Sequence, residues 1–138
     1  MSIADRITTS KQPILYSDFL NNLDVHPLSN DIASIKNTES IKQSIRNLLL
    51  TNFEERFFSP NIGSGVYRTL FEPLDDFSMD SLKLHIEDTI RQYEPRAKLI
   101  GVNVYPNEPE NSVVATIAFS IINTGQTDTL NLILRRVR

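Results

Sequence analysis

The residues with the clearest potential for chemistry are a glutamate and an arginine that flank a proline, Glu94-Pro95-Arg96. Proline supplies no backbone N–H and disfavours helical geometry for the residue before it, so a preceding helix should end at Glu94 and leave both charges at a stiff corner. On composition alone, we expect a solvated ion pair, which contributes about 0 to 1 kcal/mol to stability.

Other residue types that support catalysis or metal binding lack their usual partners. His26 and His85 have no second ligand at a metal-binding spacing, so we expect structural or solvated histidines. Gly63-Ser64-Gly65 lacks the lysine and serine that follow in a phosphate-binding loop, and no serine nucleophile signature is present. The chain has no cysteine. The sequence therefore predicts no catalytic residue, no metal site and no cofactor.

The composition points to one soluble domain. The chain has 138 residues, a formal net charge of -3 and an isoelectric point near 5.3. Such a charge gives no basic field for a phosphate backbone, so nucleic acid is not expected as a partner. The N-terminus does not resemble a signal peptide and no apolar stretch has the length to cross a bilayer, so we expect an intracellular protein without a membrane partner.

Residues 1–36 are expected to form an extended N-terminal arm, and residues 37–138 a single domain. Apolar residues of the arm follow neither a helical nor a strand period, and Pro13 and Pro27 interrupt it. Residues such as Ile14 and Tyr16 make the arm too apolar for a purely disordered tail, so we expect it to dock on the domain or on a partner.

Three helices are predicted, the first of which begins after Asn37, a possible cap. Phe57 and Phe58 should cover the end of this helix. Its apolar residues recur with a 3.6-residue period, at Ile41, Ile45, Leu48 and Leu49. Its remaining polar residues should face water or a partner: Lys42, Gln43, Arg46 and Asn47.

A short second helix should end before Pro73. The third helix should begin at a capping Ser78, with Phe77 packed on Leu82 as a hydrophobic staple. Its apolar residues have core spacing, at Met79, Leu82, Ile86, Ile90 and Tyr93.

Beyond Pro95 the apolar residues alternate, which predicts three strands linked by residues 106–111 and by a turn at 123–126. The fold is predicted to be α+β, with a small helical layer and a three-stranded antiparallel meander packed on the third helix. The inward residues of the three strands are Ile100, Val102 and Val104, then Val113, Ala115, Ile117, Phe119 and Ile121, then Leu130, Leu132 and Leu134.

A meander leaves two edges with unpaired backbone groups that can accept a strand from another chain. The last strand, over residues 127–138, carries Arg135, Arg136 and Arg138 at its end. These arginines can guard the edge against self-association or pair with an acidic partner, and the sequence leaves both alternatives open.

Three motifs occur in an order that resembles the family of baseplate wedge proteins of contractile phage tails: residues 45–51 (IRNLLLT), 70–73 (LFEP) and 93–96 (YEPR). This is the family of the T4 gene 25 product and the W-type baseplate assembly protein, with a counterpart in the type VI secretion baseplate. The similarity covers residues 37–138. The family often has a glycine where this chain has Glu54, which leaves the geometry of that turn open.

The resemblance implies a structural subunit, not an enzyme, present in multiple copies in the baseplate of a virion and assembled in the host cytoplasm. It also implies that Glu94, Pro95 and Arg96 attach the subunit to other wedge proteins, so that alanine at Glu94 or Arg96 blocks assembly but not folding. The outward residues of the last strand would face the tail-sheath protein and template sheath growth: Asn131, Ile133 and Arg135.

Some members of the family are described as lysozymes, so a peptidoglycan hydrolase is the alternative function, and a small soluble adaptor is a third. A glycosidase needs two carboxylates across a cleft, one with a raised pKa. The glutamates here fall at predicted turns and helix ends, where solvated carboxylates are expected, and no pair stands out: Glu54, Glu55, Glu72 and Glu94.

Overall fold

The computed structural model describes residues 13–136, so Arg138 lies outside the described part of the chain. The chain divides into two compact units, with the division between Ser40 and Ile41. The two units are described separately.

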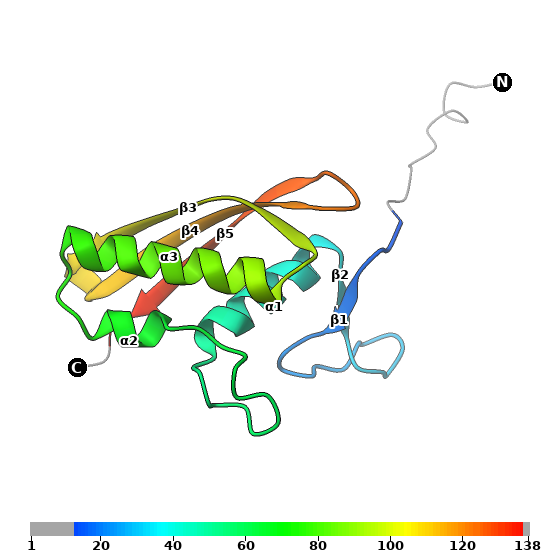
Figure 1. Cartoon of the computed structure of the whole chain (residues 1–138). Coiled ribbons are helices and arrows are strands. Elements are labelled where there is room, and N and C mark those ends of the chain that lie inside the picture. Colours follow the sequence, from blue (N-terminus) through cyan, green and yellow to red (C-terminus); the bar gives the residue numbers. More distant parts are fainter. Residues whose placement is uncertain (1–12, 137–138) are drawn as a thin grey trace. The chain divides into compact units, whose positions relative to one another are not determined.

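The first unit contains a short hairpin rather than a wholly extended arm. Strand β1 (Ser17–Phe19) pairs antiparallel with β2 (Ser34–Lys36) (Figure 1). Asn37 adopts a φ of 51°, and its side-chain Oδ1 accepts the N–H of Leu15 at 2.9 Å. The predicted cap is therefore wrong, because this amide holds the start of β1 instead of the first turn of the helix.

Helix α1 (Thr38–Leu50) buries the predicted apolar stripe. Arg46 is exposed as expected, but Gln43 is buried. The prediction that Gln43 faces water or a partner is therefore wrong, and this buried residue has an interaction partner within the protein.

The loop after α1 leaves its aromatic residues in solvent. Phe57 and Phe58 are 98% and 101% exposed, so they do not cover the end of α1. Glu54 adopts a φ of 68°, which answers the open question about this turn, since the glutamate itself takes the left-handed conformation that suits glycine. The loop leads into α2 (Val66–Leu70), the predicted short helix.

Helix α3 (Asp76–Tyr93) begins earlier than predicted. The carboxylate of Asp75 accepts the N–H of Ser78 at 2.7 Å, so Asp75 is the cap and Ser78 lies inside the helix. Phe77 is 79% exposed and forms no staple. The predicted core positions Leu82, Ile86 and Ile90 are fully buried. No helix in the described residues has the length and apolar character needed to cross a membrane.

The sheet is the predicted antiparallel meander, in the order β3-β4-β5. Its strands are β3 (Ala97–Asn107), β4 (Ser112–Ile121) and β5 (Thr127–Arg135), with a single 3-10 turn, η2 (Glu108–Glu110), between the first two. Helix α3 runs beside β3 along one face (Figure 1). The predicted inward residues of β4 and β5 are all buried. The α+β fold is confirmed.

One inward residue of β3 is predicted wrongly. Ile100 is 59% exposed, whereas Val102 is 2% exposed. The pairing register shifts between Leu99 and Gly101, so Ile100 is the extra residue of a β-bulge, which interrupts the alternation of faces.

Candidate functional site

Glu94 closes helix α3 and buries its carboxylate. Its N–H donates to the carbonyl of Ile90 at 3.0 Å, and its φ of −121° lies outside the helical range, as expected before Pro95. The residue is only 2% exposed. Arg96 donates from Nε to Oε1 at 2.7 Å and from Nη2 to Oε2 at 2.9 Å. The expected solvated pair is therefore a bidentate one in which the carboxylate is buried and the guanidinium is partly exposed.

The environment of Glu94 favours its charged form. Burial raises the pKa of this carboxyl group, but hydrogen bonds from Arg96 and Ser44 outweigh the burial and hold the pKa below its usual value. Because Ser44 belongs to α1, the carboxylate connects α1 to the end of α3. Glu94 is therefore ionised at neutral pH and serves as a tie between helices.

The backbone of the corner joins the sheet as well. The carbonyl of Arg96 accepts the N–H of Ile122 at 3.1 Å, and the carbonyl of Glu94 accepts the N–H of Ala97 at 3.3 Å. The corner thus links α1, α3 and the adjacent ends of β3 and β4. Pro95 is exposed and Arg96 is partly exposed, so these two residues form its outer surface.

The four glutamates considered for a glycosidase pair differ in their environments. A general acid in such a site needs a raised pKa, but the pKa of Glu94, the only buried Asp or Glu among residues 13–136, is lowered. Glu54 and Glu72 are exposed, and Glu55 accepts the N–H of Asn52 at 2.7 Å. Glu94 therefore lacks the environment that a general acid requires.

The hydrogen-bonding direction of β5 follows from the bonds at its two ends. At the hairpin, the N–H of Ile121 donates to the carbonyl of Gln126 at 2.8 Å, and at the far end the N–H of Arg136 donates to the carbonyl of Asn111 at 3.1 Å. Bonded pairs alternate with non-bonded pairs in an antiparallel ladder, so even-numbered residues of β5 bond to β4. The odd-numbered residues direct their N–H and C=O groups away from β4: Thr127, Thr129, Asn131, Ile133 and Arg135.

The same odd-numbered residues carry the exposed side chains. Asn131, Ile133 and Arg135 are exposed, with Ile133 at 55%. The N–H of Thr129 donates to the carboxylate of its neighbour Asp128 at 2.7 Å, in agreement with an outward direction. Within the described residues, β5 pairs with β4 alone. The predicted partner-facing residues thus present both side chain and main chain on one open edge.

Arg136 has a role that neither sequence alternative included. Its Nε donates to the carbonyl of Leu70 and its Nη2 to the carbonyl of Glu72, both at 2.8 Å. These carbonyls lie at the end of α2, where a helix has no internal donors for them. Arg136 therefore fixes the end of α2 and is not a free charge for a partner.

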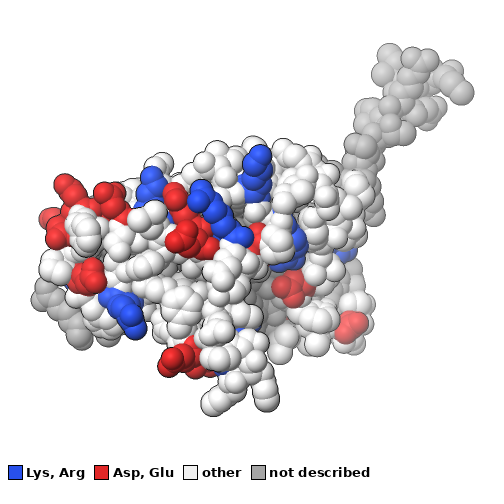
Figure 2. Space-filling view, in the orientation of Figure 1, with Lys and Arg blue, Asp and Glu red and all other residues white. Residues whose placement is uncertain are grey.

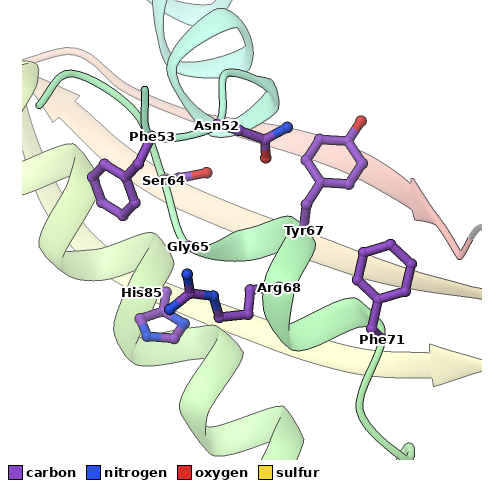
Figure 3. Close-up of a pocket in the computed structure, with 8 residues that line it drawn as sticks. All are labelled: Asn52, Phe53, Ser64, Gly65, Tyr67, Arg68, Phe71 and His85. Carbon is purple, nitrogen blue, oxygen red and sulfur yellow. The ribbon is translucent and has the colours of Figure 1, made fainter. Parts of the chain in front are cut away.

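The structure also shows a pocket that the sequence did not reveal, next to α2 and α3 (Figure 3). It has a volume of about 450 Å³. One signal was available, because Tyr67 and Phe71 are four residues apart and so share a helix face, opposite the buried face of α2. The lining residues are Asn52, Phe53, Ser64, Gly65, Tyr67, Arg68, Phe71 and His85.

Charged side chains do not gather into one strong patch on the face seen in Figure 2. Acidic and basic side chains are interspersed there, with acidic ones more frequent at one end of the molecule. This face offers no continuous basic surface of the kind that attracts a phosphate backbone.

Comparisons with known proteins fit this architecture. Residues 36–128, more than half of the chain, match the family model of baseplate wedge protein gp25. The chain is 30% identical to baseplate wedge protein gp25 of Enterobacteria phage T4 over 109 residues, which cover 79% of this chain and 82% of that protein.

Solved structures share the fold. A Geobacter sulfurreducens protein described as a tail lysozyme superposes with a TM-score of 0.69 at 24% identity, covering 72% of this chain and 91% of its own. A chain of the anti-feeding prophage baseplate gives 0.62 at 20% identity, covering 89% of this chain and 87% of its own. At these identities the likeness establishes the fold alone, whereas the family match and the phage relative establish kinship. The chain belongs to the family of baseplate wedge proteins of contractile tail systems.

Proposed function

We propose that this wedge protein is a structural subunit that starts the tail sheath by pairing the open edge of β5 with a strand of the first ring of sheath protein. The observation that carries the proposal is the edge itself. Strand β5 has nine residues and contains neither proline nor a bulge, and its odd-numbered backbone groups point away from β4. Main-chain pairing at such an edge provides affinity without requiring a pocket.

Contacts with the rest of the protein hold β5 in a fixed position, as a template for strand pairing requires. Leu130, Leu132 and Leu134 are 2% to 5% exposed and hold the inner face of the strand against the core. At its start, Asp128 forms an ion pair with Lys42 of α1 at 2.8 Å. A strand fixed in this way loses little conformational entropy when a partner strand pairs with it, because its backbone is already ordered.

We further propose that the corner attaches the protein to neighbouring wedge proteins, with a different role for each residue. Glu94 orients Arg96 from inside the protein, while Pro95 and the exposed part of Arg96 form the contact surface. In this proposal the protein belongs to the virion baseplate, in multiples of the baseplate symmetry, after assembly in the host cytoplasm. Copy number in purified particles distinguishes such a subunit from a soluble adaptor.

The test is a proline at Asn131, compared with Asn131→Ala. Proline removes an outward donor while the ladder to β4 keeps its bonds, whereas alanine removes only the side chain. We expect baseplates that contain Asn131→Pro to form but to lack sheath in electron micrographs of reconstituted tails, and Asn131→Ala to support normal sheath. Normal sheath on Asn131→Pro baseplates would refute strand pairing, and missing baseplates would place β5 in the wedge contact instead.

A further inference from the structure

The pocket beside α2 and α3 is separate from both the corner and β5, and its lining points to a peptide ligand. We propose that it receives a large apolar side chain from another baseplate subunit, with an adjacent carboxylate of that subunit bound by Arg68. The ligand is thus an acidic segment that contains an aromatic or leucine residue. This inference rests on the proposed structural role but not on the pairing of β5.

The walls of the pocket are aromatic and incompletely covered. Phe53 and Phe71 are 52% and 69% exposed, and Tyr67 is partly exposed. In Figure 3, Phe53 lies on one side of the pocket and Tyr67 and Phe71 on the other. The volume of about 450 Å³ lies in the range of small ligand sites and accommodates one or two large side chains. Aromatic walls of this kind are typical of the pockets that anchor protein interfaces.

The floor of the pocket is already ordered. A Cβ added to Gly65 would lie 3.5 Å from Nδ1 of His85, so the imidazole packs directly on this backbone. Nδ1 of His85 is also 3.0 Å from the hydroxyl of Thr69 in α2. The hydroxyl of Ser64 donates to the carbonyl of Leu49 at 2.7 Å. These contacts fix the floor without a ligand, which lowers the entropy lost when one binds.

The positive charge of Arg68 favours a ligand that carries a carboxylate. Arg68 lines the pocket, is exposed, and has no ion pair with any other residue of the described chain. A guanidinium beside aromatic walls binds a carboxylate through two parallel hydrogen bonds while the walls cover the neighbouring apolar group. Phe57 and Phe58, in the same loop as Phe53, are almost fully exposed and can extend the apolar contact beyond the pocket.

Nuclear magnetic resonance of the full-length protein tests this inference. The probe is a synthetic peptide with one phenylalanine flanked by two aspartates, and a matched peptide carries asparagines instead. We expect the aspartate peptide to shift the resonances of Gly65, Arg68 and His85, and the asparagine peptide to bind at least about tenfold more weakly, the loss of roughly one charge-assisted hydrogen bond.

Arg68→Glu should weaken binding of the aspartate peptide by more than tenfold, as expected for a reversed charge. Arg91→Glu reverses the charge of an exposed arginine of α3 that does not line the pocket, and should leave the binding of the aspartate peptide unchanged. Equal binding of the two peptides, shifts confined to other surfaces, or no binding at millimolar peptide would each overturn the proposal. Self-association that Arg68→Glu abolishes would instead identify a second copy of this chain as the occupant. None of these outcomes depends on sheath assembly.

Discussion

The corner after α3 and the edge of β5 differ in whether their polar groups have hydrogen-bond partners inside the protein. At the corner, the carboxylate of Glu94 is buried and receives bonds from Arg96 and Ser44. At β5, backbone groups that could be covered are left pointing outward. Polar groups satisfied inside the protein hold the fold, whereas polar groups left open on a rigid edge are available to a partner. Changes to the buried ion pair at the corner should therefore affect folding, whereas changes at the edge should affect assembly without affecting folding.

The opposite edge of the sheet strengthens this comparison. Strand β3 has a bulge at Ile100 and carries Pro106, which has no N–H to offer a partner strand. Bulges and prolines are common protections of a sheet edge against unwanted pairing. Strand β5 has neither, so the molecule closes one edge and leaves the other open.

The largest loss of stability is expected for Arg96→Ala. This change leaves the carboxylate of Glu94 buried without its bidentate partner, and breaking a buried pair in this way costs about 3–5 kcal/mol. We therefore expect a marked loss in the free energy of unfolding, measured by urea denaturation. The family resemblance instead implies that this variant remains folded but fails to assemble. An unchanged stability would show that the ion pair at the corner is not a structural tie.

The pH dependence of stability should distinguish the contribution of Glu94 from that of Arg96. Because the pKa of Glu94 is lower in the folded protein, its contribution is present above its unfolded pKa of about 4.3 and is lost as the pH falls through the folded pKa. Glu94→Gln should remove this part of the acid sensitivity. In Arg96→Ala the carboxyl group of Glu94 loses the arginine that lowers its pKa, so it takes up a proton more readily at acidic pH. Because a protonated carboxyl group has less need of the arginine, this variant should be destabilised less at pH 4 than at pH 7. Parallel pH profiles for all three proteins would contradict this account.

Two neighbouring residues of β5, Leu132 and Ile133, provide a matched pair of substitutions with a smaller expected effect on stability. Leu132→Ala removes a buried side chain and should cost about 2–5 kcal/mol, whereas Ile133→Thr changes an exposed one and should alter stability by no more than about 0.5 kcal/mol. Thermal unfolding of the isolated protein measures both. Similar losses for the two variants would mean that the outer face of β5 is already covered.

No effect at all is expected on peptidoglycan. Glu94 lacks the raised pKa of a general acid. Highly purified protein should therefore fail to clear a turbid peptidoglycan suspension. Clearing that a single glutamate-to-glutamine change abolished would show that the protein is an enzyme.

The periodic parts of the sequence were sufficient to predict the core. Alternation along β4 and β5 and the 3.6-residue period of α1 and α3 identified the buried residues, because burial of a whole face imposes a regular pattern. The bulge at Ile100 was not predicted, since the inserted residue moves the inward positions from odd to even numbers and is itself apolar, so Ile100 fits the even-numbered alternation that follows it. The cap at Asp75 was not predicted because Ser78, three positions later, is an equally good capping residue.

The character of the candidate site was harder to predict than its position. The chain reversal at Glu94 follows from Pro95, but its burial depends on Ser44 and on the packing of α1, which are distant in sequence. The pocket depends on three separate segments, the loop, α2 and α3, and so has no local pattern. Arg136 likewise acts on carbonyls more than sixty positions away.

The alternation of β5 also restricts the amino-acid sequence of any chain that pairs with it. Residues of an added strand that lie opposite Leu130, Leu132 and Leu134 would extend the inner face, and those between them would join the solvent-exposed face of the sheet. Because the Lys42–Asp128 ion pair closes the inner face at one end, the apolar positions would begin opposite Leu130. Any strand that pairs with β5 would therefore need an apolar residue at every second position, and a one-residue slip in register would place its apolar side chains in water.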